Sequence, residues 1–267
     1  MVNNVRYKEF YEQHKNFSLR TLSEYYLSPG IRCKFDLLLK NLGSKRKFTN
    51  ALEIGCSGDS FLYFYEMIIH KSFLDIAITP LKQYIPKNRK LQNKPYYKMH
   101  PICVDMVQLP YQANQFDLII ALDVLEHIKN DKAAIKEISR VIKSKGIVVI
   151  TVPHRKKYYT QQDKIIGHYR RYEIRELKDM FEVNGFKEIR TFGIYGQLMK
   201  ISEIQAVNPD KVEENLIKLR TKYSDNPVFR SFWKKFVKFC SILMKLDATH
   251  RSIRSAMNIA MIFQKKM

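Results

Sequence analysis

The stretch Phe48-Thr-Asn-Ala-Leu-Glu-Ile-Gly-Cys-Ser-Gly58 decides the fold that this sequence predicts. It is a short apolar run closed by a glycine turn, and the segment Ser60–His70 that follows is compatible with a helix. Strand, turn and helix in this order begin an α/β unit. The turn departs from the dinucleotide-binding pattern G-x-G-x-x-G, but its glycines would let the backbone pass close to a ligand.

Strand and helix signals keep alternating after this unit. Residues 116–122 and 146–153 are continuously apolar, as strands buried on both faces should be. Residues 128–142 and 173–184 are predicted helices. Shorter strand-like runs lie at 73–77, 101–105, 186–194 and 258–263. The alternation predicts an α/β protein with a Rossmann-like, seven-stranded, doubly wound sheet.

Two helical additions interrupt this pattern, one at each side of the core. We expect both to flank the mouth of the substrate site. The predicted organisation is an N-terminal helical cap at 1–47, a core at 48–196, a helical insertion or lid at 197–256, and a final core strand at 257–267.

The net charge of +21 is unevenly spread. Residues 51–150 are nearly balanced, whereas residues 151–267 carry a surplus of twelve positive charges. Such a surplus suits an anionic partner, which could be an acidic membrane face, a phosphorylated substrate or nucleic acid; a lysine-rich proteome is the alternative. The apolar runs are too short to span a membrane, and no apolar signal region is visible. We expect a cytoplasmic protein, and a second expectation is that it associates peripherally with the inner face of the membrane.

Three acidic residues fall at the ends of the first three predicted strands: Glu53, Asp75 and Asp105. In an open parallel sheet, ligands bind beyond the carboxyl ends of the strands. A carboxylate at Asp75 can accept hydrogen bonds from both ribose hydroxyls of a nucleoside, and Asp105 is well placed for an exocyclic adenine amine. These positions predict a nucleoside-binding site.

Four segments together resemble the class I S-adenosylmethionine-dependent methyltransferases in their order and spacing. The resemblance covers about residues 45–195 and the last strand. It implies methyltransferase activity with S-adenosyl-L-methionine as cofactor. The segments are Leu52–Gly58, Val104–Pro110, Gln115–Ile128 and Gly146–Pro153.

The resemblance also implies roles for single residues. The sequence departs from the family at Ser57 and Asp59, where the family commonly continues Gly-x-Gly. The alternative to a cofactor-binding turn is that Gly55 and Gly58 merely turn the chain. By the family's pattern, Glu53 and the turn of Gly55, Cys56 and Gly58 would hold the methionine end, Asp75 the ribose, and Asp105 and Met106 the adenine, while Ala121 would offer backbone.

Methyl transfer needs an oriented acceptor and a group that removes the acceptor's proton. His154 directly follows the fifth predicted strand, and His168 lies in the next connection, so either could serve as the base. A hydrogen-bonded structural histidine is the alternative for each.

His168 belongs to the string Gly167-His-Tyr-Arg-Arg-Tyr172. This string resembles one found in a subset of these methyltransferases whose acceptors look like glycans or lipids. Arg170 and Arg171 could clamp a phosphate or carboxylate, while Tyr169 and Tyr172 could stack on a ring. A salt-bridge cluster at the start of the following helix is the alternative.

Asp123, Glu126 and His127 stand at i, i+3 and i+4, so they would share one face of a helix that starts there. The spacing resembles the Glu-x-x-Glu-His of quinone-pathway O-methyltransferases, and a divalent metal is conceivable. We expect no metal; the residues would shape the acceptor pocket or cap the helix, and His127 is a third catalytic candidate. No two of the four cysteines form C-x-x-C, so zinc and redox chemistry are not expected.

The sequence narrows the acceptor class. Leu122–His127 follows the fourth strand in place of the Asn/Asp-Pro-Pro-Tyr/Phe motif of adenine, cytosine and glutamine N-methyltransferases, and no cysteine has the setting of a C5-cytosine nucleophile. We expect a small-molecule, lipid-linked or glycan acceptor, methylated at oxygen. An RNA methyltransferase and a non-catalytic subunit that binds S-adenosylmethionine are the alternatives.

Residues 229–245 have the pattern of a basic amphipathic helix. Such a helix can lie in an anionic membrane surface, anchored by aromatic side chains and lysines. Packing of its apolar stripe on the core, as a lid over the acceptor pocket, is the alternative. The stripe comprises Phe229, Phe232, Trp233, Phe236, Cys240, Leu243 and Met244, with Lys234, Lys235, Lys238 and Lys245 off it.

Overall fold

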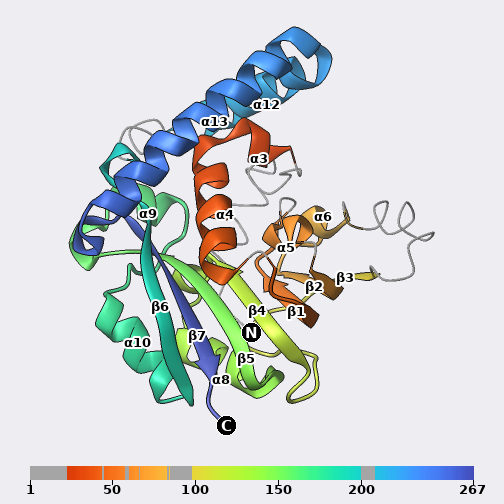
Figure 1. Cartoon of the computed structure of the whole chain (residues 1–267), viewed down its shortest axis with the longest axis vertical. Coiled ribbons are helices and arrows are strands. Elements are labelled where there is room, and N and C mark those ends of the chain that lie inside the picture. The colour runs from red at the N-terminus through yellow and green to blue at the C-terminus, as the bar shows by residue number, and fades with distance from the viewer. Residues whose placement is uncertain are drawn as a thin grey trace.

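A seven-stranded sheet forms the centre of the molecule (Figure 1). The computed structural model describes residues 23–43, 45–57, 60–65, 67–82, 84, 98–199 and 208–267. The strand order is β3-β2-β1-β4-β5-β7-β6, and β7 runs antiparallel to both of its neighbours while the other pairs are parallel. The predicted Rossmann-like, doubly wound sheet is confirmed. The strands are β1 (Phe48–Ile54), β2 (Ile68–Asp75), β3 (Lys98–Cys103), β4 (Phe116–Leu122), β5 (Ile142–Pro153), β6 (Phe186–Tyr195) and β7 (Asn258–Lys265).

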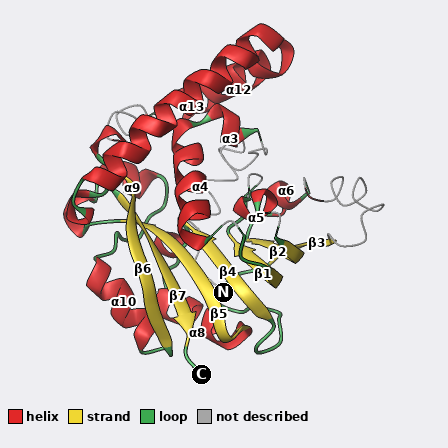
Figure 2. Ribbon diagram, viewed as in Figure 1, coloured by secondary structure: helices red, strands yellow, loops and turns green. Residues whose placement is uncertain are grey.

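Helices cover both faces of the sheet (Figure 2). On one face, Ile138 of α8 and Phe181 of α10 belong to a cluster of fully buried side chains with the sheet. On the other face, Leu38 of α4 joins a second buried cluster. Both faces of β4 and β5 are therefore dry, which explains their continuously apolar sequences. The helices here are α3 (Glu24–Leu27), α4 (Pro29–Leu42), α8 (Asp131–Val141), α9 (Gln161–Ile165) and α10 (Ile174–Glu182).

The predicted helix at Ser60–His70 is wrong. Among the described residues of this segment only α5 (Phe61–Phe64) is helical, and Ile68 already begins β2, paired with Phe48 of β1. β-branched Ile68 and Ile69 favour the extended chain, and the parallel partner strand supplies their hydrogen bonds. The predicted second strand at 73–77 consequently starts too late. A helical turn after it is present as α6 (Ile78–Leu81).

Two long helices stand between β6 and β7 in the chain: α12 (Pro209–Asp225) and α13 (Pro227–His250). The Trp233 indole donates to the Leu27 carbonyl at 3.1 Å, and Lys245 pairs with Asp36 of α4 at 2.6 Å. These contacts fix one side of α13 on α3 and α4. The predicted apolar stripe therefore divides, since Trp233 faces α3 while Phe232 is 62% exposed.

None of the helices in the described part of the chain is both long and apolar enough to cross a lipid bilayer.

Candidate active site

The turn after β1 depends on Gly55, whose φ is 68°. Its N–H donates to the Leu74 carbonyl at 2.8 Å, which ties the turn to the end of β2. A Cβ at this position would lie 2.4 Å from Cγ2 of Val124 in the β4 connection. Both the conformation and the close approach therefore require glycine here.

Glu53 is buried and holds the first turn of α5. Its carboxylate accepts hydrogen bonds from the Phe61 and Leu62 amides at 3.0 and 2.8 Å and from the Ser60 hydroxyl. An acidic group at a helix N-terminus satisfies amides that have no partner within the helix. Glu53 thus shapes the turn that the resemblance assigns to the methionine end of the cofactor.

Asp75 is buried at the end of β2. Its carboxylate oxygens accept from the Ser57 and Ala77 amides at 3.0 and 2.9 Å. Burial raises the pKa of this carboxyl, although the amides lower it in part. Each carboxylate oxygen can accept a further hydrogen bond, so the side chain retains capacity for a hydroxyl ligand.

A cavity lies between these strand ends. Gly55, Asp75 and Asp105 line it together with apolar side chains, among them Met106. Asp105 is fixed by the Val107 amide, which donates to Oδ1 at 3.1 Å. The structure thus brings two of the three strand-end acids, Asp75 and Asp105, to one cavity, whereas Glu53 is not among the described residues that line it.

The other predicted cofactor residues lie differently. Cys56 and Ala121 are buried and are not among the described residues that line the cavity. Ala121 pairs with Ile54 across β4 and β1. Gly58 lies outside the described residues.

A polar network begins at the end of β4, beside this cavity. Asp123 has a φ of 55° and accepts hydrogen bonds from Lys34 at 2.7 Å, from the Thr151 hydroxyl at 2.9 Å and from Asn258 at 2.9 Å. Burial favours the neutral carboxyl, but Lys34 and Thr151 outweigh it and lower the pKa of Asp123. The positive φ of a non-glycine residue at a strand end is typical of functional sites.

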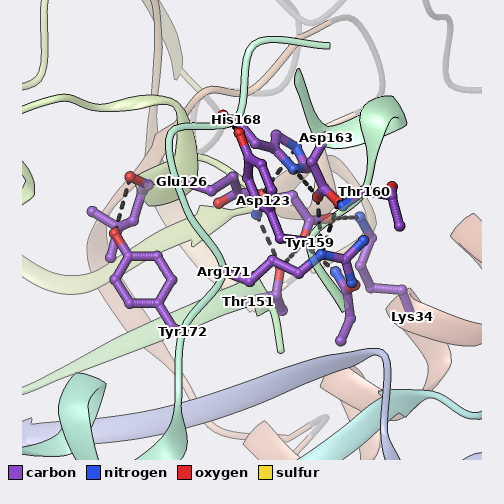
Figure 3. Close-up of polar contacts among 12 residues, drawn as sticks. Lys34, Asp123, Glu126, Thr151, Tyr159, Thr160, Asp163, His168, Arg171 and Tyr172 are labelled. Carbon is purple, nitrogen blue, oxygen red and sulfur yellow. Dashed lines mark hydrogen bonds and ion pairs between the residues drawn. The ribbon is translucent and has the colours of Figure 1, made fainter. Parts of the chain in front are cut away.

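His168 lies in this network and is oriented by Asp163 (Figure 3). Its Nδ1 is 2.7 Å from Oδ1 of Asp163, and Nε2 is 3.9 Å from Oε1 of Glu126. Arg171 donates to both oxygens of Asp163 at 2.9 and 3.0 Å. An imidazole held at Nδ1 by a carboxylate presents Nε2 as its basic nitrogen, as in the His of a catalytic triad.

Glu126 and His127 lie on the short 3-10 helix η1 (Leu125–His127), which does not include Asp123. The predicted common helix face of these residues is therefore wrong, because the chain turns with a positive φ at Asp123. Burial, together with Asp123, raises the pKa of Glu126 well above its usual range. Burial and His168 hold the pKa of His127 well below its usual range.

These two residues and His168 form the one described group of three side chains whose ligand atoms lie within 4.8 Å of one another. Neither carboxylate oxygen of Glu126 has a hydrogen-bond partner among the described residues. A carboxyl that is neutral at neutral pH fits this burial better than an isolated carboxylate. Carboxylate and imidazole groups of this kind also ligate metal ions, so the prediction that no metal binds here stays a prediction.

His154 lies in the junction of β5 and β7 and away from this network. Its Nδ1 is 3.1 Å from the Ala256 carbonyl, its backbone amide donates to Met257, and burial lowers its pKa. The ring is 1% exposed. These contacts favour the structural alternative for His154.

The string at 167–172 divides between the network and the core. The Tyr172 ring is fully buried, and its hydroxyl hydrogen is shared between two acceptors, Oδ2 of Asp131 at 2.7 Å and the Leu125 carbonyl at 3.1 Å. A buried ring offers no face to a substrate, so stacking by Tyr172 is corrected to a packing role. Arg170 forms an ion pair with Asp131, as the salt-bridge alternative expects. Tyr169 lies below the Arg170 guanidinium, 5.9 Å from ring centre to Cζ.

Sequence reasoning missed Asp163 and Lys34. Asp163 has a local signal, because Thr160 and Asp163 form a capping box at α9. Lys34 has none, since it meets Asp123 across 89 positions of the chain.

Replacing Asp163 with asparagine is expected to lower the free energy of unfolding at pH 7 by about 2 kcal/mol. Burial opposes the charge, yet His168, Arg171 and the Thr160 amide hold the pKa of Asp163 at about 2, below its unfolded value. The stabilisation is therefore complete above about pH 4 and is lost as the pH falls toward about 2. Urea unfolding at pH 7, 4 and 2.5 measures this.

The matched control is Asp179→Asn, because Asp179 is exposed and its ion pair with Arg175 is long, at 4.0 Å. It should change the free energy by less than about 0.5 kcal/mol. An equal pH dependence for wild type and Asp163→Asn would contradict the predicted charge state.

Residues 52–150 match a protein family described as methyltransferase domain. An uncharacterized protein of Methanocaldococcus jannaschii is 30% identical over 163 residues, 61% of this chain and 65% of that protein. A probable S-adenosylmethionine-dependent methyltransferase of Mycolicibacterium smegmatis is 24% identical over 93 residues, 34% of this chain and 36% of that protein. The chain thus spans less than two thirds of the length of either relative.

The fold is shared with solved structures. Phosphoethanolamine N-methyltransferase 2 of Haemonchus contortus, in complex with S-adenosyl-L-methionine, matches with a TM-score of 0.61 at 18% identity. The match covers 97% of this chain and 60% of that chain. At this identity the likeness establishes the fold, and the site must be argued from this chain's own residues.

Proposed function

We infer, from the match of residues 52–150 to the methyltransferase domain family, that this chain is an S-adenosylmethionine-dependent methyltransferase. The observation that carries the proposal is the cavity at the ends of β1, β2 and β3, where Asp75 and Asp105 face the same space as Gly55. A nucleoside needs acceptors for its ribose hydroxyls and its amine, and these residue types supply them. Gly55 keeps the turn packed against Val124, and both residues line the cavity.

The residues that would hold the cofactor follow from this placement. Asp75 would bind the ribose hydroxyls, Asp105 the adenine amine, and Met106 would pack on the ring. Bound there, S-adenosylmethionine supplies a methyl group on a positively charged sulfur. Glu53 acts indirectly, because its oxygens hold α5 and thereby the turn above the methionine end.

His168 is proposed as the base. Nε2 of His168 would take up the proton of the acceptor's hydroxyl; the cofactor would supply the methyl group that the oxygen receives and would keep the electron pair of the broken carbon–sulfur bond on sulfur. Asp163 holds Nδ1 at 2.7 Å and stabilises the imidazolium that results. His127 supports this ring by an edge-on contact with 4.6 Å between ring centres.

The acceptor is proposed to be a small molecule, lipid-linked or a glycan, methylated at oxygen. The imidazole of His168, oriented by the carboxylate of Asp163, suits deprotonation of a hydroxyl, and Arg170 lies partly exposed beside the network. The positive surplus of residues 151–267 supports work at the inner, anionic face of a membrane as a peripheral protein. RNA is an alternative acceptor that rests on charge alone.

Transfer of labelled methyl from S-adenosylmethionine to fractionated cell extract tests the proposal. We expect label in the lipid or glycan fraction with wild type and none with Asp75→Ala. Label confined to RNA would establish the alternative acceptor. A folded wild-type chain that binds S-adenosylmethionine yet labels no fraction would contradict catalysis and favour a binding subunit.

A further inference from the structure

The side of α13 that faces away from α4 is apolar and exposed. Val237, Ser241 and Ala248 are the buried residues of this helix. At about 100° per residue, the exposed apolar residues lie on the opposite side of the helix from these three. We call them the outer face of α13; they are Val228, Phe232, Phe236, Phe239, Ile242, Leu243 and Leu246, each between 41% and 80% exposed.

Positive charge accompanies the outer face. Lys235 lies within it and Lys238 at its border, both exposed and in no ion pair among the residues that the structure describes. Asp247 is the only acidic residue between Pro227 and His250, and it is paired with Arg251. The face therefore combines large apolar side chains with cations that form no ion pair within the described part of the chain.

The position of α12 and α13 leaves the outer face of α13 exposed within the described part of the structure. Figure 1 shows α12 and α13 extending beyond the sheet, past α3. The inner side of α13 packs on α4, and α4 carries Lys34, which contacts Asp123 in the network described above. A surface that meets the outer face of α13 would therefore be joined to the polar network through one helix.

We propose that the outer face of α13 docks on an anionic lipid bilayer. Phe232, Phe236 and Phe239 enter the boundary between headgroups and acyl chains, and Lys235 and Lys238 meet lipid phosphates. A bilayer is the occupant for two reasons. The unpaired charges on the outer face are all positive, and they are interleaved with aromatic side chains. In addition, α13 would lie along the bilayer surface without crossing the bilayer. The proposal names the surface for the peripheral association proposed above, rests on that association, and does not depend on methyl transfer.

Sedimentation of the full-length chain with vesicles tests it. Wild type should bind vesicles with 30% phosphatidylglycerol at least tenfold more tightly than pure phosphatidylcholine vesicles, with affinity falling as salt rises. Lys235→Glu with Lys238→Glu should cost at least tenfold on the anionic vesicles. Phe232→Ser with Phe239→Ser should cost at least tenfold on the same vesicles.

Matched controls remove the same groups elsewhere. Lys132→Glu with Lys136→Glu places the charge reversal on α8, and Val183→Ser with Ile189→Ser removes exposed apolar side chains near β6. Both should bind vesicles within twofold of wild type. Far-ultraviolet circular dichroism confirms that each variant folds.

Three outcomes would overturn the proposal. The first is that wild type does not sediment with anionic vesicles at low salt. The second is that the outer-face variants and the control variants lose the same vesicle affinity. The third is that the chain binds no vesicles but associates with itself, and that Phe232→Ser with Phe239→Ser abolishes this self-association. The last result would assign the face to a second copy of the chain. Because S-adenosylhomocysteine binding is measured without vesicles, its failure is distinguishable from failure of docking.

Discussion

Replacing His168 with glutamine is expected to lower kcat by about 10²- to 10⁴-fold, the usual contribution of a general base. Glutamine keeps a polar side chain next to Asp163 but cannot take up the acceptor's proton. Affinity for S-adenosylhomocysteine should stay within about twofold, because His168 is not among the described residues that line the cavity. Steady-state kinetics and calorimetry on the same preparation measure both values.

The matched control for this change is His154→Gln. His154 is buried against Ala256 in the β5–β7 junction, so its loss should reduce stability and leave kcat within about threefold. Dialysis against a chelator is a second control, and wild type should retain its kcat. A loss of activity that a divalent metal restores would show that Glu126, His127 and His168 hold a metal, which would contradict the role of His168 as base.

Replacing Asp75 with alanine is expected to weaken binding of S-adenosylhomocysteine by at least about 100-fold. Two hydrogen bonds from ribose hydroxyls to a carboxylate are lost, each worth about 1.5 kcal/mol, and every 1.4 kcal/mol is tenfold in affinity. The Ser57 and Ala77 amides also lose their acceptor. Equilibrium dialysis with labelled ligand measures the loss.

Asp75→Asn separates ligand contact from support of the turn. Asparagine keeps one oxygen acceptor and the volume of the side chain, so its loss of affinity should be smaller than that of alanine. Thermal unfolding of each variant checks that the turn survives. Equal affinity in wild type and both folded variants would remove Asp75 from the binding site.

The strands could be predicted because burial on both faces leaves an unmistakable apolar run, as at residues 116–122. The segment Ser60–His70 could not, since its apolar residues fit a helix and a strand equally well. Pairing of Ile68 with Phe48 decides between them, and a single segment does not contain that tertiary contact.

The acids of the cavity could be predicted from the sequence because Asp75 ends β2 and Asp105 closely follows β3, and the carboxyl ends of neighbouring parallel strands share one edge of a sheet. Only part of the network around His168 could be predicted from the sequence. Asp163 lies five positions from His168, but Lys34 reaches Asp123 from an N-terminal helix far away in the chain. Periodicity also failed for α13, because that helix is apolar on two opposite sides and the spacing does not say which side packs on α4.

Calorimetric titration of the wild-type chain with S-adenosylhomocysteine tests the central claim most directly, because it requires no knowledge of the acceptor. The account predicts saturable binding with one site per chain. A wild-type chain that is folded by circular dichroism and takes up no S-adenosylhomocysteine would contradict it.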